Sequence, residues 1–357
     1  MLLVVGVLAV VAAVGFVHTT AARVGTVLVA VILVLGSGAA AVNAYYEYYR
    51  TLGEAIGGAP PDEESLAGAE RGSGRMPARG RVVPVDIRGT SSGFAARTAQ
   101  VYLPPAWWKR PRPALPVIVL LHGSPGSPTD WVEGGQAQVT ADTWAAEHNG
   151  VGPVVVMPDS NGSFIADTEC VDSPLGRVET YLTVDVPAAV RKMFATQAPG
   201  KGWAVAGLSE GGSCAIMLAL RHPKMFVAFG DYGGLAGPRV GDTNADTAST
   251  VAQLFGGSKQ QFDANEPASI MRGTRFAGLG GWFEVGSADA EPLAAADQLA
   301  PLAVAAGVST CLVVVPGGEH TWDVWTTAFR TSLPWLAAQL RLVPATPTMT
   351  SGCRQPA

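Results

Sequence analysis

The stretch Gly207-Leu208-Ser209-Glu210-Gly211 decides how the chain is interpreted, because it places a serine between two glycines. The apolar run 203–206 precedes it and the helix-like run 213–220 follows it, which predicts a strand, a sharp turn and a helix. Such a turn strains its central residue and needs neighbours with almost no side chain, which the flanking glycines provide. Ser209 is therefore predicted to stand at the carboxyl edge of a sheet, with its hydroxyl free to act as a nucleophile.

Composition limits the classes of protein to which the chain can belong. Its 357 residues are 48% hydrophobic, which is enough for a large core and excludes disorder throughout. The net charge is −5 and no basic stripe alternates with aromatic residues, so we expect no nucleic-acid partner. The sequence has no phosphate-binding loop, metal-ligand cluster or dinucleotide fingerprint, so we expect no cofactor and no metal.

Two apolar runs occupy the N-terminus. Residues 1–17 carry no charge, and a second uncharged run covers 24–42, with Arg23 in the short spacer between them. Each run is close to the length of a membrane-spanning helix, so residues 1–44 are predicted to form a transmembrane hairpin. Arg23 favours a cytoplasmic turn and an extracytoplasmic main domain. The alternative is a signal peptide cleaved in the small-residue stretch 36–41, which would release a secreted protein.

The rest of the chain is predicted to form a connection, one domain and a tail. Residues 45–80 begin with four tyrosines and continue with Gly, Pro and charged residues, which predicts an aromatic belt and a flexible tether. Residues 81–343 alternate strand-like and helical patterns, which predicts an α/β domain with a mostly parallel sheet, helices on both faces and an opening hairpin. Residues 344–357 are predicted to be a short tail. The predicted strands are 82–87, 99–105, 116–121, 154–158, 203–206, 226–230, 281–286 and 310–315, and the predicted helices are 138–148, 182–194, 213–220 and 292–306.

A serine nucleophile needs a base and a carboxylate that orients the base, and on such a sheet both follow the serine along the chain. Among the five histidines His320 fits best, because it stands in a turn after the last predicted strand. That turn would bring it to the carboxyl edge of the sheet. The carboxylate is expected in the loop after strand 281–286, with Asp289 as first choice, Glu291 as second and Asp231 as third.

Two backbone amides complete the predicted site. The amide of Glu210 comes directly after the nucleophile, and the amide of Ser124 lies in a glycine-containing loop after a buried strand. Both are expected to donate hydrogen bonds to an oxyanion. The segments 159–164 and 167–181 follow another strand at the same edge, where open sheets of this class bind ligands, and are expected to shape the substrate site.

The chain has four cysteines without C-x-x-C spacing, which argues against a zinc or redox motif. In an extracytoplasmic compartment Cys170 could reach Cys214 on the helix after the nucleophile, and the bridge would tie a substrate-side loop to the catalytic turn. Buried free thiols are the alternative. The pairing of Cys311 and Cys353 stays open at this point.

Three separated motifs resemble one branch of a known superfamily. Leu120-Leu121-His122-Gly123, the turn at 207–212 and Glu319-His320-Thr321-Trp322 are similar to the putative-esterase branch of the α/β-hydrolases. That branch includes S-formylglutathione hydrolases, feruloyl and enterochelin esterases, and secreted mycolyltransferases. The resemblance covers about residues 81–343 and implies an α/β-hydrolase fold.

At the matching positions the resemblance implies roles for single residues. Glu210 and His122 depart from the mycolyltransferase pattern, which has methionine and Asp-Gly at these places.

The leading hypothesis is a membrane-anchored, extracytoplasmic serine esterase that acts on small-molecule or lipid esters through an acyl-enzyme. The alternatives are acyl transfer onto a sugar or glycerol, and a catalytically inactive hydrolase fold used as a binding module. The implied residues are Ser209 as nucleophile, His320 as base, Asp289 or Glu291 as acid, and the amides of Ser124 and Glu210 as oxyanion donors.

Overall fold

A computed structural model describes residues 20–46, 65–72, 74–245 and 247–354 of the chain. The chain divides into two compact units, Met1–Gly58 and Ala59–Ala357. In the first unit the described residues form the helix α2 (Thr20–Tyr46), which carries exposed valine, leucine and isoleucine side chains along its middle.

The predicted transmembrane hairpin is not confirmed. Its first helix, 1–17, lies outside the described residues, and its second, 24–42, falls within α2. Across the described residues, no helix combines the length and the hydropathy that crossing a bilayer requires. Most of the predicted belt and tether, from 47 to 64, also lies outside the described residues.

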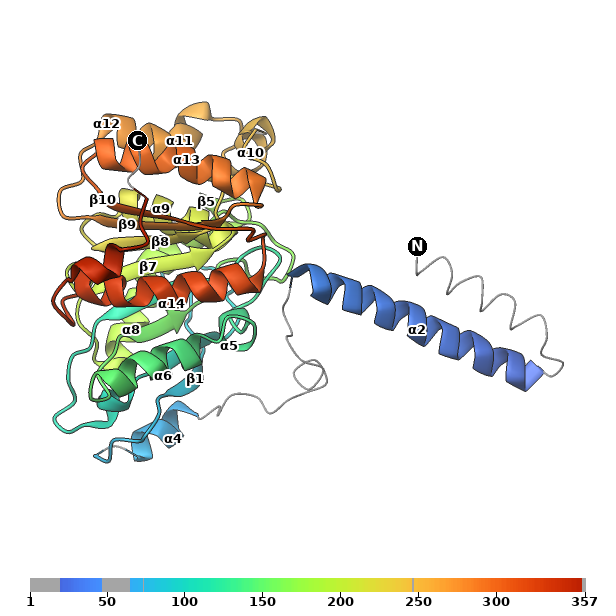
Figure 1. The fold of residues 1–357 in the computed structure, drawn as a ribbon, viewed down its shortest axis with the longest axis horizontal. Helices are drawn as coiled ribbons and strands as arrows, with labels where there is room; N and C mark the ends of the chain where they lie inside the picture. The colour runs from blue at the N-terminus through green and yellow to red at the C-terminus, as the bar shows by residue number, and fades with distance from the viewer. Residues whose placement is uncertain (1–19, 47–64, 73, 246, 355–357) are drawn as a thin grey trace. The chain divides into compact units, whose positions relative to one another are not determined.

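The second unit is built on an eight-stranded sheet in the order β1-β2-β4-β3-β7-β8-β9-β10 (Figure 1). The first two strands form an antiparallel hairpin, β2 is antiparallel to β4, and all pairs from β4 to β10 are parallel. The predicted mostly parallel sheet with an opening hairpin is therefore confirmed. The strands are β1 (Arg81–Val85), β2 (Ala99–Leu103), β3 (Val117–Leu121), β4 (Val154–Met157), β7 (Trp203–Leu208), β8 (Ala228–Tyr232), β9 (Gly280–Gly286) and β10 (Ser309–Val315), with a separate small hairpin of β5 (Asp172–Ser173) and β6 (Gly176–Arg177).

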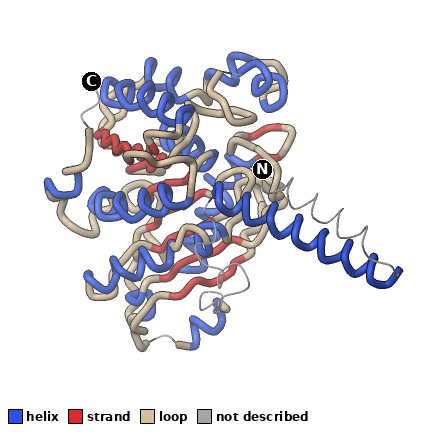
Figure 2. Tube along the Cα trace, turned by 45° about the vertical axis from the view of Figure 1, so that its right-hand side comes forward, coloured by secondary structure: helices blue, strands red, loops and turns tan. Residues whose placement is uncertain are grey.

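Helices cover both faces of the sheet, and Figure 2 shows the strands as an inner layer between them. α6 and α14 pack together on one face, and α9, α12 and α13 pack on the other. Because both faces are covered, β3, β4 and β7 are buried at every position, as their continuous apolar sequences predict. The helices are α5 (Asp130–Glu133), α6 (Ala137–Glu147), α7 (Val178–Thr180), α8 (Val186–Phe194), α9 (Glu210–Arg221), α10 (Thr247–Leu254), α11 (Lys259–Asp263), α12 (Pro267–Gly273), α13 (Ala290–Ala305) and α14 (Trp322–Gln339). Two 3₁₀ helices, η1 (Pro105–Trp108) and η3 (Pro347–Thr350), and the π-helical segment η2 (Tyr181–Asp185) complete the set in the described residues.

The last part of the predicted tether packs against the α/β domain. It contains the helix α4 (Leu66–Arg71), and Ser65 caps this helix because its Oγ accepts a hydrogen bond from the Gly68 amide. The indole of Trp108 donates to the carbonyl oxygen of Ala69 at 2.8 Å, and Ala69 is fully buried. The structure therefore places α4 in the domain, ahead of the boundary predicted at residue 81.

The C-terminal segment is fastened to the edge of the sheet. Cys353 forms a disulfide with Cys311 of β10, and the amide of Arg354 donates to the carbonyl oxygen of Leu312 at 2.7 Å. β10 is the outermost strand, and these contacts cover part of its open edge. The pairing that the sequence left open is thus Cys311 with Cys353.

Candidate active site

Ser209 occupies the sharp turn between β7 and α9. Its backbone angles are φ 51° and ψ −123°, a conformation that residues with a side chain rarely adopt. A side chain at Gly207 would overlap the backbone of Gly211, and one at Gly211 would lie 2.5 Å from the carbonyl oxygen of His122. The turn therefore requires glycine at both positions, and this requirement explains the two glycines that flank Ser209 in the sequence.

Three side chains meet at this turn in one line of hydrogen bonds. His320 Nε2 lies 2.9 Å from Ser209 Oγ, and His320 Nδ1 lies 2.6 Å from Asp289 Oδ2. Asp289 stands between β9 and α13, and His320 stands in the loop between β10 and α14. All three residues thus follow the carboxyl ends of parallel strands, as the sequence predicts, and the first-choice carboxylate is the one beside the histidine.

The other two candidate carboxylates make structural contacts. Glu291 Oε2 accepts hydrogen bonds from the amide and the side-chain nitrogen of Asn244, at 2.7 and 2.9 Å. Asp231 is buried, and its Oδ1 accepts a hydrogen bond from the Gly234 amide at 2.8 Å. The structure therefore brings neither of them to His320.

An aromatic ring holds the imidazole from the side. Trp325 of α14 packs edge-on against His320, with 4.8 Å between the ring centroids. A Cβ atom at Gly233 would lie 3.2 Å from Trp325 Nε1 and 3.6 Å from Asp289 Oδ2, so this glycine lets the backbone approach both groups. Trp325 was not among the predicted site residues, although its place five residues after His320 puts it on the first turn of the next helix.

The two predicted oxyanion donors flank Ser209. A Cβ atom at Gly123 would lie 3.1 Å from Ser209 Cβ, so the peptide that carries the Ser124 amide is next to the nucleophile. His122 Nδ1 donates to the Gly123 carbonyl oxygen at 2.8 Å, and this carbonyl belongs to the same planar peptide as the Ser124 N–H. His122 therefore fixes the direction of that amide. Glu210 is the first residue of α9, so its amide has no acceptor within the helix.

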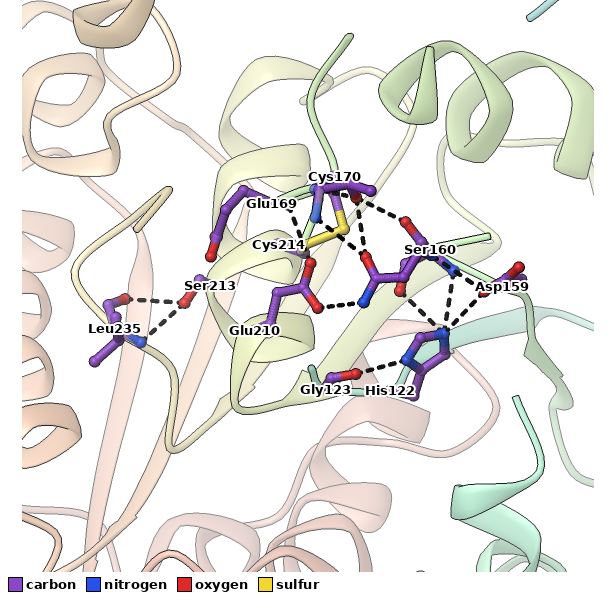
Figure 3. The surroundings of a disulfide bond; sticks show 12 residues. His122, Gly123, Asp159, Ser160, Glu169, Cys170, Glu210, Ser213, Cys214 and Leu235 are labelled. Atoms are coloured by element: carbon purple, nitrogen blue, oxygen red, sulfur yellow. Dashed lines mark hydrogen bonds and ion pairs between the residues drawn. A yellow bond between two sulfur atoms is a disulfide. The ribbon is translucent and has the colours of Figure 1, made fainter. Parts of the chain in front are cut away.

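His122 is itself held in a buried polar network, drawn in Figure 3. Its Nε2 lies 3.3 Å from Asp159 Oδ1 and 3.2 Å from the Ser160 amide nitrogen. Arg97 forms an ion pair with the same Asp159 oxygen at 2.6 Å. Burial acts to raise the pKa of Asp159, but its hydrogen bonds with His122 and Arg97 outweigh burial and hold that pKa below its usual range. The carboxylate thus stays charged.

The side chain of Glu210 fastens the loop 159–170 to α9. Asn161 Nδ2 donates to Glu210 Oε2 at 2.6 Å, and the Glu169 amide donates to Oε1 at 3.0 Å. Burial, together with the charge of Asp167, raises the pKa of Glu210 to about 8. The sequence predicts a role for the amide of Glu210 but not this role of its side chain.

A disulfide between Cys170 and Cys214 closes the same junction, beside Glu210 (Figure 3). This bridge is the one that the sequence predicts, and both sulfur-bearing residues are buried. The loop that follows β4 is therefore joined covalently to the helix that follows the nucleophile.

A serine on a strand-to-helix turn, with a histidine and an aspartate from later loops of a parallel sheet, defines a serine hydrolase of the α/β-hydrolase fold. Residues 95–336 match the family described as Putative esterase, and the chain belongs to this family. It is thus a carboxylic ester hydrolase, and the family expected from the three sequence motifs is confirmed.

Other proteins are similar to this chain in sequence or in fold. An uncharacterised protein of Corynebacterium glutamicum is 36% identical over 322 residues, which cover 86% of this chain and 74% of that protein. An S-formylglutathione hydrolase from Agrobacterium tumefaciens has a similar structure, with a TM-score of 0.60 at 20% identity over 74% of this chain and 98% of that chain. A ferulic acid esterase gives a TM-score of 0.57 at 20% identity, over 73% of this chain and 99% of that chain. At this level of identity the two structures show the fold alone.

The contacts of the two neighbouring carboxylates predict different effects of their amide substitutions. Asp289→Asn should lower kcat for p-nitrophenyl acetate by about 10³- to 10⁴-fold, because a neutral amide can neither hold the productive tautomer of His320 nor stabilise its cation. Glu291→Gln should change kcat less than about tenfold, because Glu291 bonds to Asn244 and not to the histidine. Equal losses in the two variants would contradict this assignment of the acid.

Burial raises the pKa of Asp231 to about 7, against about 3.9 in an unfolded chain. Between these values the folded state binds more protons than the unfolded state, so this group stabilises the fold at pH 4 and loses that effect as the pH rises to 7. Asp231→Asn keeps an acceptor for Gly234 and cannot ionise, so its Tm should fall less between pH 5 and 7.5 than that of the wild type. The exposed substitution Asp297→Asn is the control and should keep the wild-type slope. Parallel slopes for Asp231→Asn and the wild type would refute the prediction.

Proposed function

We propose that this protein hydrolyses carboxylic esters through a covalent acyl-enzyme on Ser209. The observation that carries the proposal is the line of hydrogen bonds from Asp289 through His320 to Ser209, at 2.6 and 2.9 Å. These distances are within the range that proton transfer between a nucleophile and its base requires. The complete arrangement also argues against the alternative of an inactive binding module.

In the first half of the reaction, Ser209 Oγ forms a bond to the ester carbonyl carbon while His320 Nε2 takes its proton. The carbonyl oxygen becomes an oxyanion, which accepts hydrogen bonds from the amides of Ser124 and Glu210. Asp289 stabilises the positive charge of the imidazolium. The intermediate then expels the alcohol, which leaves with the proton from His320, and the acyl group stays on Ser209.

In the second half, water replaces the alcohol. The water oxygen attacks the acyl carbon while His320 takes a proton from the water. His320 then returns a proton to Ser209 Oγ as the carboxylic acid leaves. Acyl transfer to a sugar or glycerol, the alternative predicted from the sequence, would use the same acyl-enzyme with a hydroxyl group in place of water. Hydrolysis is the proposed reaction, with a small-molecule or lipid ester as substrate.

We place this activity in an extracytoplasmic compartment. Two disulfides, Cys170 with Cys214 and Cys311 with Cys353, support that location, because such bonds form and persist where the surroundings are oxidising. Membrane attachment through residues 1–44 stays a prediction and forms no part of the proposal.

A fluorophosphonate probe tests the nucleophile directly. Such probes form a covalent bond with an activated serine, so the purified chain should carry one adduct on the peptide that contains Ser209. Ser209→Ala should abolish both the adduct and ester hydrolysis while its circular dichroism spectrum matches that of the wild type. Undiminished labelling of Ser209→Ala would exclude Ser209 as the nucleophile.

The compartment can be tested in cells that produce the protein naturally. Cells are quenched in acid, thiols are alkylated with N-ethylmaleimide in denaturant so that buried cysteines also react, and peptides are mapped without reduction. We expect both disulfides and no alkylated cysteine, because an oxidising compartment keeps the bonds formed. Cys214→Ala serves as control, since it leaves Cys170 free to react. Alkylation of all four cysteines in the wild type would place the domain in a reducing compartment.

A further inference from the structure

Three exposed apolar side chains lie on the segments that follow β4. Phe164 is 58% exposed, Ile165 is 82% exposed, and Leu175 is 56% exposed. In the described part of the second unit, every exposed phenylalanine, isoleucine or leucine falls between residues 164 and 175. Single apolar residues on a surface need no explanation, but a group of the largest ones beside a catalytic site does. We call Phe164, Ile165 and Leu175 the apolar shelf.

Hydrogen bonds connect this shelf to the oxyanion loop. The Gly126 amide donates to the carbonyl oxygen of Phe164 at 2.9 Å, and Ser124 Oγ donates to the carbonyl oxygen of Ala166 at 3.0 Å. Phe164 and Ile165 thus stand directly beside the loop whose Ser124 amide faces the substrate oxygen.

The segment that carries Phe164 and Ile165 is held firmly at both ends. At its start, the Asp159 carboxylate accepts hydrogen bonds from the Asn161 and Gly162 amides, at 3.1 and 3.0 Å. At its end, Thr168 Oγ1 donates to the Ser160 carbonyl oxygen at 2.7 Å, and the Cys170 disulfide follows two residues later. The exposure of the two side chains is therefore a fixed feature, and a ligand would not have to order the loop on binding.

The hairpin that carries Leu175 rests on the same support as this loop. A Cβ atom at Gly162 would lie 3.3 Å from the ring of Phe94, and one at Gly176 would lie 2.8 Å from it. Both segments therefore pack against Phe94, one through Gly162 and the other through Gly176. This shared contact places the turn that carries Leu175 next to the loop that carries Phe164 and Ile165.

Three side chains are too small an area for a stable contact between two copies of the chain, which needs about 800 Å² from each partner. They are well matched to a hydrocarbon chain, which gains about 25 cal/mol for each Å² of apolar surface removed from water. We propose that the apolar shelf binds an aliphatic chain of the ester substrate, so that the enzyme prefers lipid-like esters over acetyl esters of short alcohols. This inference rests on the proposed ester hydrolysis at Ser209.

The test compares chain-length dependence in the full chain and its variants. For the acyl side, kcat/KM is measured for p-nitrophenyl acetate, butyrate, hexanoate and octanoate below their solubility limits. For the alcohol side, the ethyl and octyl esters of acetic acid are compared by acid release. A methylene half removed from water should change kcat/KM about twofold. If three or four methylenes rest on the shelf, the wild type should favour the long chain by about tenfold in at least one series.

The double variant Phe164→Ser/Ile165→Ser should lower that long-to-short ratio about tenfold in the same series, and Leu175→Ser should lower it about twofold. The matched control is Val304→Ser, an exposed apolar residue at the far end of α13, about 22 Å along the helix from Asp289. It should leave both the activity and the ratio unchanged. The series in which the ratio falls identifies the acyl or the alcohol chain as the group on the shelf.

Three results would overturn the inference in different ways. Hydrolysis that depends on Ser209, with the same ratio in the wild type and the double variant, would refute the shelf and leave the proposed function intact. The absence of any hydrolysis by the wild type would refute both. A change of molecular mass in light scattering, without a change of ratio, would show that the shelf is a contact between copies and would also overturn it.

Discussion

The backbone of Ser209 can adopt its left-handed turn only because three segments leave room for it. Glycines at 207, 211 and 123 remove side chains where the end of β7, the start of α9 and the loop after β3 converge. A strained residue of this kind costs about 1–3 kcal/mol, which the surrounding packing must offset. α9 is buried at every position from Glu210 to Leu220, so the helix cannot relax the turn without exposing apolar surface. The nucleophile and both oxyanion amides therefore belong to one rigid unit, and the histidine and the carboxylate reach it from other loops.

The loop after β4 gives this unit a second support, made of contacts of several chemical kinds. A disulfide, a buried carboxylate, an ion pair and two backbone contacts join it to α9, to the first β-hairpin and to the oxyanion loop. Buried carboxylates fix both ends of the loop: Asp159 accepts hydrogen bonds from amides at its start, and Glu210 accepts one from the Glu169 amide near its end. Because several independent contacts hold this loop, its substrate-facing surface is ordered before binding. Little free energy is then needed to order it when the substrate binds.

The sequence predicts those parts of the site that depend on local pattern and chain order. Ser209 follows from its glycines, and His320 follows from its place after the last strand. The choice between Asp289 and Glu291 could not be made from local sequence. Glu291 is bound by Asn244, which lies 47 residues earlier in the chain, and this contact leaves Asp289 to pair with the histidine. The orientation of His122, the anchoring role of Glu210 and the packing of α4 were missed because each depends on contacts with residues about 40 to 50 positions away. The apolar N-terminus, in contrast, gave a strong pattern for a membrane hairpin that the described helices do not confirm.

The tail that closes on β10 changes what can be removed from the chain. A fragment cut at residues 81 and 343, the limits suggested by periodicity, would lack both α4 and Cys353. Trp108 would lose the acceptor of its indole, and Cys311 would become an unpaired thiol on the outermost strand. A free thiol beside an uncovered strand edge favours covalent dimers and edge-to-edge association. Shortened forms intended for crystallisation or binding assays should therefore begin before Ser65 and end after Arg354.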